Sequence, residues 1–136
     1  MKAYFGRRYL VSASHRLHAP ALTAEQNRAA YGKCNNANGH GHNYTVEILV
    51  GGVVAAETGM VVDLVALDEA VFERVVNRFD HANLNLDPIF ADCVPTTENL
   101  CKGIFELLKD ALPAGKLEQV RVEETENNFF ECLAKG

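Results

Sequence analysis

From residue 40 to residue 54 the chain reads HGHNYTVEILVGGVV, which is the clearest strand pattern in the sequence. Polar and apolar residues alternate along it, which is the period of two expected of a strand with one buried face. The even positions share that face: His40, His42, Tyr44, Val46, Ile48 and Val50. We therefore predict a strand over about 40–54, in which Gly51-Gly52 indicates a bulge or the start of a turn.

A first strand is predicted upstream, from Tyr4 to His15. Its odd positions Phe5, Tyr9, Val11 and Ala13 share an apolar face that ends in His15, and Arg7 interrupts this pattern. Between the two strands, Thr23 and Gln26 have the spacing of a capping box, so a short helix should run to about residue 30. Gly32 would end that helix, and a loop follows before the second strand.

Two amphipathic helices are predicted downstream. Asp63 would cap the first, which ends near Arg78, and the second follows Pro95 and is ended by Pro113 and Gly115. Their apolar residues recur at helical spacing: Leu64, Leu67, Val71 and Val75 in the first, and Leu100, Ile104, Leu107, Leu108 and Ala111 in the second.

Two strand patterns close the chain, from Leu117 to Thr125 and from Phe129 to Leu133. The order strand, strand, helix, helix, strand, strand predicts an α+β fold, a four-stranded antiparallel sheet with two helices on one face. Such a sheet has two exposed edges, and joining neighbouring subunits through them is the natural remedy. We therefore expect an oligomer.

The composition is that of a globular protein. With 136 residues, 48% hydrophobic and 23% charged, we expect one domain over residues 1–136. A net charge of -5 without any run of Lys and Arg argues against nucleic acid. No apolar run is long enough for a membrane span and no leader pattern opens the chain, so we expect no membrane association and a cytoplasmic location.

Four cysteines without close C-x-x-C spacing are expected to be reduced thiols. Cys101 lies in a helical apolar pattern and Cys132 in a strand pattern, so both are interpreted as small core residues. Cys93 falls in a predicted loop. Only Cys34, which is close in sequence to His40 and His42, carries a functional signal.

Three histidines are candidate metal ligands. His15 ends the first strand, and His40 and His42 begin the second, so antiparallel pairing of the two strands would bring all three to one end of the sheet. Three imidazoles are a ligand set for catalytic zinc, Zn²⁺, that leaves one coordination position open. Cys34 could be a fourth ligand that closes a structural site, a nucleophile or a general base. His18 is interpreted as a surface residue.

Other polar residues have both a functional and an ordinary interpretation. Asp80-His81 could be a simple turn after a helix, or a histidine and its orienting carboxylate that work with Cys34. Glu98 could serve only the dipole of a helix N-terminus. Glu124 ends an apolar strand face, where it could reach water or bind two adjacent N–H groups of a heterocycle.

Several motifs together resemble the 6-pyruvoyltetrahydropterin synthase family over nearly the whole chain. They occur in the family's order and contain unusual residue types. They are Val11-Ser12-Ala13-Ser14-His15-Arg16-Leu17, the segment from Gly32 to Tyr44, Thr58-Gly59-Met60-Val61, Asp80-His81-Ala82-Asn83-Leu84, Thr96-Thr97-Glu98-Asn99 and Glu124-Thr125.

The resemblance implies the tunnelling fold (T-fold), in which three subunit sheets form a β-barrel and two trimers stack into a homohexamer. It implies zinc on His15, His40 and His42. It also implies catalysis by Cys34 of one subunit with Asp80 and His81 of a neighbour. Glu124, with Thr97 and Glu98, would belong to the pterin-binding and acid-base part of the pocket.

The implied substrate is 7,8-dihydroneopterin triphosphate, a pterin triphosphate that loses triphosphate during an internal redox reaction to give 6-pyruvoyltetrahydropterin. A sister branch, 6-carboxytetrahydropterin synthase of queuosine biosynthesis, acts on the same substrate but releases acetaldehyde. Five residues separate Cys34 from His40, which is similar to the pyruvoyl enzymes. A non-catalytic pterin- or zinc-binding module is the third hypothesis.

Overall fold

A computed structural model describes residues 1–112 and 116–135. The strands and helices follow in this order: β1 Lys2–His15, α1 Ala24–Tyr31, η1 Gly32–Asn35, β2 His40–Val53, α2 Leu64–Val71, η2 Phe72–Val76, α3 Asn77–Phe79, β3 Ala82–Asn83, η3 Leu84–Leu86, η4 Pro88–Phe90, α4 Thr97–Leu108, β4 Lys116–Glu123 and β5 Phe129–Leu133. The strands form one sheet in the order β3-β1-β2-β4-β5.

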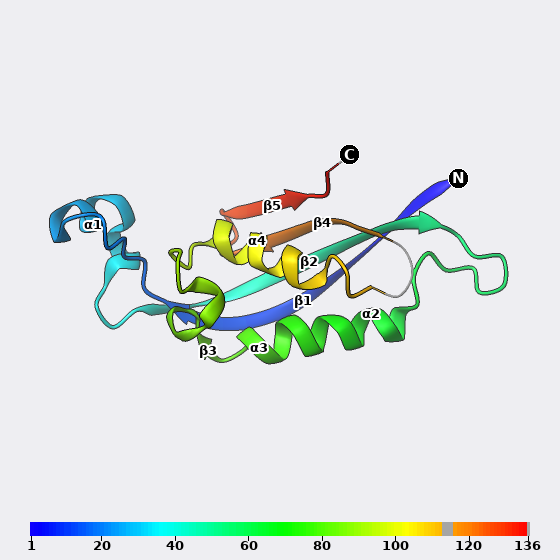
Figure 1. Cartoon of the computed structure of the whole chain (residues 1–136), viewed down its shortest axis with the longest axis horizontal. Helices are drawn as coiled ribbons and strands as arrows, with labels where there is room; N and C mark the ends of the chain where they lie inside the picture. The colour runs from blue at the N-terminus through cyan, green and yellow to red at the C-terminus, as the bar shows by residue number, and fades with distance from the viewer. Residues whose placement is uncertain (113–115, 136) are drawn as a thin grey trace.

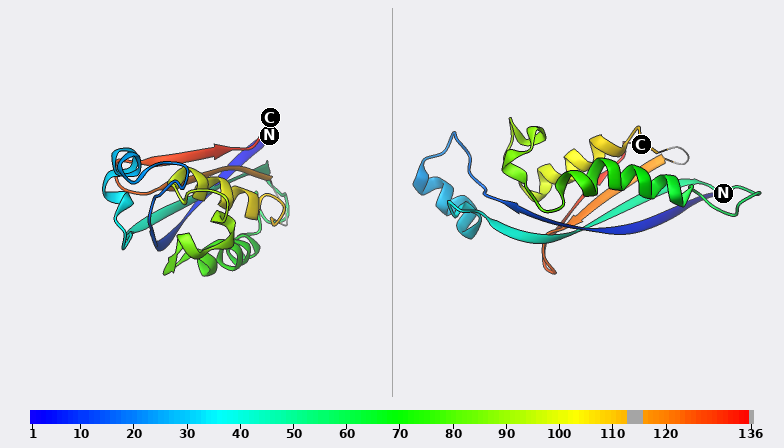
Figure 2. Two further views of the ribbon diagram at one scale, coloured as in Figure 1. Left: turned by 60° about the vertical axis from the view of Figure 1, so that its left-hand side comes forward. Right: turned by 90° about the horizontal axis from the view of Figure 1, so that it is seen from below.

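The long antiparallel pair of β1 and β2 runs through the length of the molecule (Figure 1). Helices α2 and α4 cover one face of the sheet, and the view from below shows them on the same side (Figure 2). The α+β prediction with two helices on one face is thereby confirmed. The core lies between these layers and includes Tyr44, Val46, Ile48 and Val50 of β2, all fully buried.

The predicted helix starts are confirmed. Thr23 and Gln26 form a complete capping box at α1, Asp63 caps α2 and Thr96 caps α4. In each case a short side-chain oxygen accepts a backbone N–H that the helix itself cannot satisfy. The second predicted helix ends earlier than expected, at Leu108 with Lys109 as its C-cap, so Ala111 lies in the turn that follows. Pro113 and Gly115, which were expected to end it, lie outside the described residues.

The sheet differs from the prediction in two details. A fifth strand, β3, pairs parallel with β1 over Ala13 and Ser14; two residues are too few to produce a periodic sequence pattern. The irregularity near Gly51 comes from β4, because Leu49 pairs with Gln119 and the next residue of β2 pairs with Leu117. Glu118 is therefore the extra residue, and its side chain fills the space that a Cβ at Gly51 would need.

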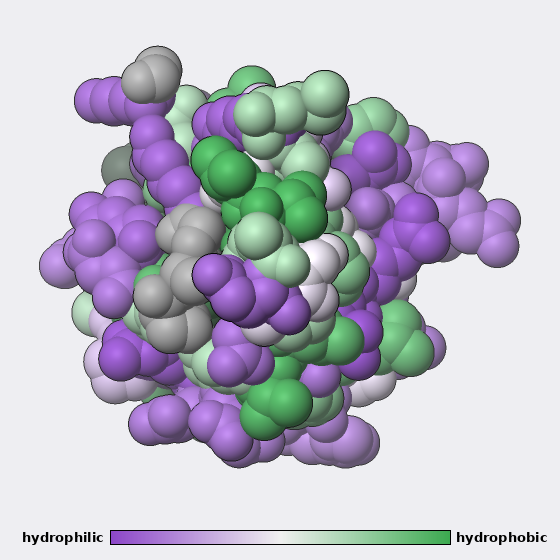
Figure 3. Space-filling model, turned by 90° about the vertical axis from the view of Figure 1, so that its right-hand side faces the viewer, coloured by the Kyte–Doolittle hydropathy of each residue, from purple (hydrophilic) through white to green (hydrophobic). Residues whose placement is uncertain are grey.

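The two ends of the molecule have different surfaces. Both chain termini and the ends of β2 and β5 lie in the right-hand half of the molecule in Figure 1, and apolar side chains gather on the surface seen from that side (Figure 3). Exposed apolar residues of these segments include Val53, Val54, Met60 and Leu133. The opposite end, below α1, carries the histidines. No helix in the ranges that the structure describes is long and apolar enough to cross a membrane.

Candidate metal centre

The strand register brings the three histidines together. His15 is the direct partner of His40, and His42 is the partner of Ala13. Gly39 makes this approach possible, because its φ of 70° is in the left-handed region and a Cβ there would lie 3.0 Å from the His15 carbonyl oxygen. The predicted convergence of the three imidazoles at one end of the sheet is confirmed.

Five side chains offer metal-ligand atoms that all lie within 4.8 Å of one another: His15, Cys34, His40, His42 and Glu124. The Nε2 atoms of His40 and His42 are 2.8 Å apart, and the Cys34 Sγ lies 3.5 Å from His40 Nε2. Nitrogens around one tetrahedral zinc ion are about 3.3 Å apart. The cluster therefore has the size of a metal site.

The neighbours of His15 leave one of its nitrogens free to coordinate a metal. Its Nδ1 lies 2.9 Å from the Pro95 carbonyl oxygen, which can only accept, so Nδ1 carries the proton. The buried Nε2 has no hydrogen-bond partner among the described residues, and its lone pair points into the cluster. Burial lowers the pKa of His15 and of His42. Both imidazoles are thus held in the neutral form that metals bind.

Cys34 is held against the end of β1 by its own loop. Leu17 donates its N–H to the Cys34 carbonyl oxygen at 2.6 Å, and the buried Asn35 amide donates to the Leu17 carbonyl oxygen at 2.7 Å. Burial and the nearby charge of Glu124 raise the pKa of the Cys34 thiol. Without a cation beside it, Cys34 is therefore protonated at neutral pH.

Glu124 follows β4 and connects the cluster to a neighbouring cavity. One carboxylate oxygen lies 2.9 Å from His42 Nε2, and the other accepts a hydrogen bond from the Thr97 hydroxyl at 2.7 Å. Thr97, Glu98 and Glu124 line a mainly polar hollow of about 400 Å³ together with Asn127 and Asn128. The three predicted substrate-binding residues thus share one cavity.

Asp80 and His81 lie at the sheet edge. Asp80 accepts the backbone N–H of Ser12 at 2.8 Å and lies 3.0 Å from His81 Nδ1. This backbone hydrogen bond, and then the His81 imidazole, lower the pKa of Asp80. The His81 side chain is 83% exposed, and its φ is 59°. Within one chain His81 faces a hollow beside Ser12 and Asn43, whereas Cys34 belongs to the histidine cluster.

Sequence reasoning missed residues that orient the cluster. The Tyr44 hydroxyl lies 3.2 Å from His15 Nδ1, next to the Pro95 carbonyl that holds the same nitrogen. Asn35 holds the Cys34 loop. A buried tyrosine on the histidine face was visible in the strand pattern, but its partner was not. His18, interpreted as a surface residue, is half-buried, with Nδ1 3.1 Å from the Asn35 amide.

Comparisons of the sequence and of the structure place the chain in a known protein family. The profile of the family described as 6-pyruvoyl tetrahydropterin synthase matches residues 6–135. The chain is 47% identical over 129 residues to the 6-pyruvoyl tetrahydrobiopterin synthase of Homo sapiens, an alignment that covers 94% of this chain and 89% of that protein.

Two further relatives extend the comparison. The structure of Caenorhabditis elegans 6-pyruvoyl tetrahydropterin synthase superposes with a TM-score of 0.93 at 37% identity, and covers 99% of this chain and 97% of that one. A putative 6-carboxy-5,6,7,8-tetrahydropterin synthase of Archaeoglobus fulgidus is 38% identical over 112 residues, 82% of this chain and 88% of that protein. The chain belongs to the 6-pyruvoyl tetrahydropterin synthase family.

Proposed function

We propose that the protein is a zinc-dependent lyase that converts 7,8-dihydroneopterin triphosphate to 6-pyruvoyltetrahydropterin with loss of triphosphate. The observation that carries the proposal is the meeting of the three histidine Nε2 atoms with a separate thiol and a carboxylate in one cluster. A set of residues that could hold a metal ion, beside a group that can move protons, would suit proton transfer at carbons of a substrate side chain. The 47% identity to the human 6-pyruvoyl tetrahydrobiopterin synthase supports this product.

His15, His40 and His42 would hold the zinc ion. The orphaned Nε2 of His15 and the lowered pKa of His15 and His42 fit neutral imidazole ligands. A bound zinc ion supplies Lewis acidity, which makes C–H bonds next to the coordinated side-chain oxygens of the substrate more acidic. Cys34 would then remove and return protons as the general base.

Glu124, Thr97 and Glu98 would bind the pterin ring. The Thr97 hydroxyl fixes one oxygen of Glu124, so the carboxylate has a defined orientation at the polar hollow it shares with Glu98. A carboxylate held in this way can accept two parallel N–H groups from the guanidine-like edge of a pterin. The substrate side chain would extend from there toward the histidine cluster.

We also propose a homohexamer, one pterin synthase domain over residues 1–136 in each subunit, with active sites shared between subunits. Strand β1 meets β3 only at Ala13 and Ser14, so most of that edge has no strand partner in the described chain. A neighbour's sheet could pair with it. The exposed His81, oriented by Asp80, is then available to the Cys34 of a neighbouring subunit. A cytoplasmic location stays a prediction.

The first test is turnover. The purified, zinc-loaded protein should release triphosphate from 7,8-dihydroneopterin triphosphate, and no release would contradict the lyase proposal. The shared site has a separate test, in which inactive Cys34→Ala and His81→Ala subunits are unfolded, mixed and refolded together. Mixed hexamers would contain sites with both native residues and should regain part of the activity. Mixtures that stay inactive, although mass spectrometry shows mixed oligomers, would contradict the shared site.

The carboxy product is a second candidate. The 38% identity to the putative Archaeoglobus fulgidus 6-carboxy-5,6,7,8-tetrahydropterin synthase favours it. Mass spectrometry of the pterin product separates the two reactions, because the pyruvoyl product keeps all three side-chain carbons and the carboxy product keeps one. Acetaldehyde in the assay would identify the carboxy reaction.

The non-catalytic module has one observation in its favour, the proximity of Cys34 to the histidine nitrogens. If Cys34 were a fourth ligand that closes the site, it would resist alkylation until zinc is removed, and Cys34→Ala would lose zinc. The lyase proposal predicts instead that Cys34→Ala retains zinc and folds but does not turn over.

A further inference from the structure

A pair of thiols lies away from the histidine cluster, where helix α4 packs against β4 and β5. The Cys101 Sγ is 3.2 Å from the Val120 carbonyl oxygen and 3.6 Å from that of Phe130. Val120 is the strand partner of Cys132, whose side chain packs against the same core. Both side chains therefore lie at the same pair of strands, and after burial the neighbouring Cys132 thiol also raises the pKa of Cys101.

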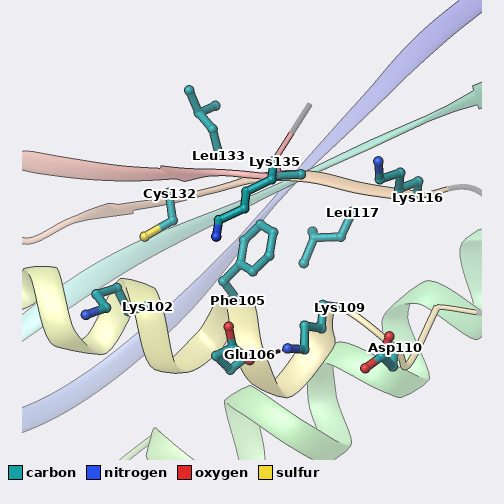
Figure 4. Close-up of a pocket in the computed structure, with 11 residues that line it drawn as sticks. Lys102, Phe105, Glu106, Lys109, Asp110, Lys116, Leu117, Cys132, Leu133 and Lys135 are labelled. Carbon is teal, nitrogen blue, oxygen red and sulfur yellow. Dashed lines mark ion pairs between the residues drawn. The ribbon is translucent and has the colours of Figure 1, made fainter.

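The two thiols differ in access. Cys101 is fully buried and Cys132 is half-buried. Cys132 lines a cavity of about 560 Å³, and its sulfur points from β5 toward α4 (Figure 4). Burial strongly raises the pKa of the Cys101 thiol, so this thiol is protonated and unreactive toward solvent reagents. A reagent in the cavity would reach Cys132 first.

The cavity has a positive rim and an apolar wall. Its lining includes Phe105 and Leu117. Its charged residues are Lys102, Lys109, Lys116, Lys135, Glu106 and Asp110. Lys109 pairs with Glu106 at 2.5 Å, which leaves three ammonium groups and one carboxylate around the opening. In a chain of net charge -5, this local excess of positive charge would favour an anionic reagent.

We propose that Cys101 and Cys132 are a thiol-disulfide exchange site for a small anionic disulfide, such as glutathione disulfide. The Cys132 thiol loses its proton to solvent, and its thiolate attacks one sulfur of the reagent. This step forms a mixed disulfide and releases one glutathione thiolate, which takes up a proton from solvent. The Cys101 sulfur then attacks Cys132 Sγ and expels the second glutathione, while the Cys101 proton goes to a released thiolate. Two protein thiols lose two electrons and one disulfide reagent becomes two thiols.

The product would be a covalent link between α4 and β5. Helix α4 begins at Thr97, which hydrogen-bonds Glu124, and β5 is the neighbour of β4, which leads into Glu124. The exchange site is therefore joined to the candidate active site by two regular elements, although the thiols take no part in the proposed lyase reaction.

The test uses a Cys93→Ser background, because the exposed Cys93 would also react. The folded protein is treated with glutathione disulfide, quenched with acid and N-ethylmaleimide, and mapped by peptide mass spectrometry. We expect a Cys101–Cys132 disulfide in the parent and a persistent glutathione on Cys132 in Cys101→Ser. Cys132→Ser should leave Cys101 unmodified. Cys101→Ala repeats the experiment if the serine variant does not fold. An unreacted Cys132, or the same mixed disulfide in parent and Cys101→Ser, would overturn the proposal.

The charge of the cavity has its own test. Rates with glutathione disulfide and with the cationic disulfide cystamine are each divided by the rate for the urea-unfolded protein, which removes intrinsic reactivity. The corrected rate should be about tenfold higher for the anionic reagent at low salt. Lys102→Glu combined with Lys135→Glu should reverse this order. Equal corrected rates in the parent would overturn the assignment of an anionic reagent.

Discussion

The histidine cluster and the Asp80-His81 pair are both candidate parts of one active site, yet they differ in how far the surrounding protein buries their side chains. The side chain of His15 is fully enclosed, whereas that of His81 is 83% exposed. The cluster is completed by β1, β2 and the loop of Cys34 within one chain. The edge pair has its carboxylate and backbone partners, but no thiol is among the described residues that line the hollow beside His81. In the proposed hexamer, one chain would build the metal-binding half of the site, and the other half would depend on a neighbouring subunit.

Removing a cluster histidine should have the largest effect. In His40→Ala we expect loss of zinc and a fall in turnover of about a thousandfold or more, because several kcal/mol of Lewis-acid stabilisation disappear. Metal analysis and triphosphate release measure both changes. His18→Ala is the matched control, since His18 lies outside the cluster. If His40→Ala keeps stoichiometric zinc, the three-histidine site is wrong.

Changing the edge pair should affect catalysis alone. We expect His81→Ala to lower turnover by about a hundredfold or more, the usual contribution of acid-base catalysis. Zinc content and the denaturation midpoint should stay close to those of the parent, because the imidazole is exposed and buries little surface. A His81→Ala protein with parental activity would remove this residue from the proposed mechanism.

A change beneath Cys34 should have an intermediate effect. Asn35→Ala leaves the Leu17 carbonyl oxygen without its buried donor, which we expect to lower the free energy of unfolding by about 1–3 kcal/mol. Urea unfolding measures the loss. Asn38→Ala, at an exposed position of the same loop, should be close to neutral. Equal effects of the two substitutions would show that the buried amide does not hold the loop.

The smallest effect concerns pH. Burial lowers the pKa of His15 and His42 below the usual 6.5. The unfolded chain therefore binds more protons than the folded chain as the pH falls below 6.5, so the metal-free protein loses stability there and has its full stability above it. Urea unfolding at about pH 7.5 and about pH 5.5 tests this sign. His42→Gln should show a shallower decline, and a stability that rises on acidification would contradict the buried neutral imidazoles.

Much of the fold could be predicted because strand alternation and helix-capping residues are visible in short segments of the sequence. The alternation in β2, the capping residues Thr23, Asp63 and Thr96, and the end of β1 at His15 follow from periodicity and backbone hydrogen bonding. Strand β4 ends at Glu123, before the predicted end at Thr125. The two-residue strand β3 could not be predicted from the sequence. It forms because the end of α3 places the residues that follow it beside β1, and this is a tertiary contact. The bulge at Glu118 was equally invisible, since it requires the register of two strands.

In the candidate site too, features set by strand alternation could be predicted, and contacts between distant segments could not. His15, His40 and His42 could be predicted to converge because strand alternation determines which side chains share a face. Which groups orient them could not be predicted: the Pro95 carbonyl reaches His15 across 80 residues of chain, and no local pattern records such a contact. The pairing of His81 with Cys34 lies beyond both the sequence pattern and a single chain, and it stays a prediction.

The left-handed backbone of His81, with φ 59°, has a consequence for how the protein can change. A side chain with a Cβ in this region costs about 1–2 kcal/mol relative to ordinary backbone. His81→Gly would remove that cost, offset in part by the greater backbone entropy that glycine loses on folding, while His81→Ala would retain it. If the imidazole is needed for turnover, selection for robustness and selection for activity oppose each other at this position. A thermostable variant carrying glycine here would be an inactive one.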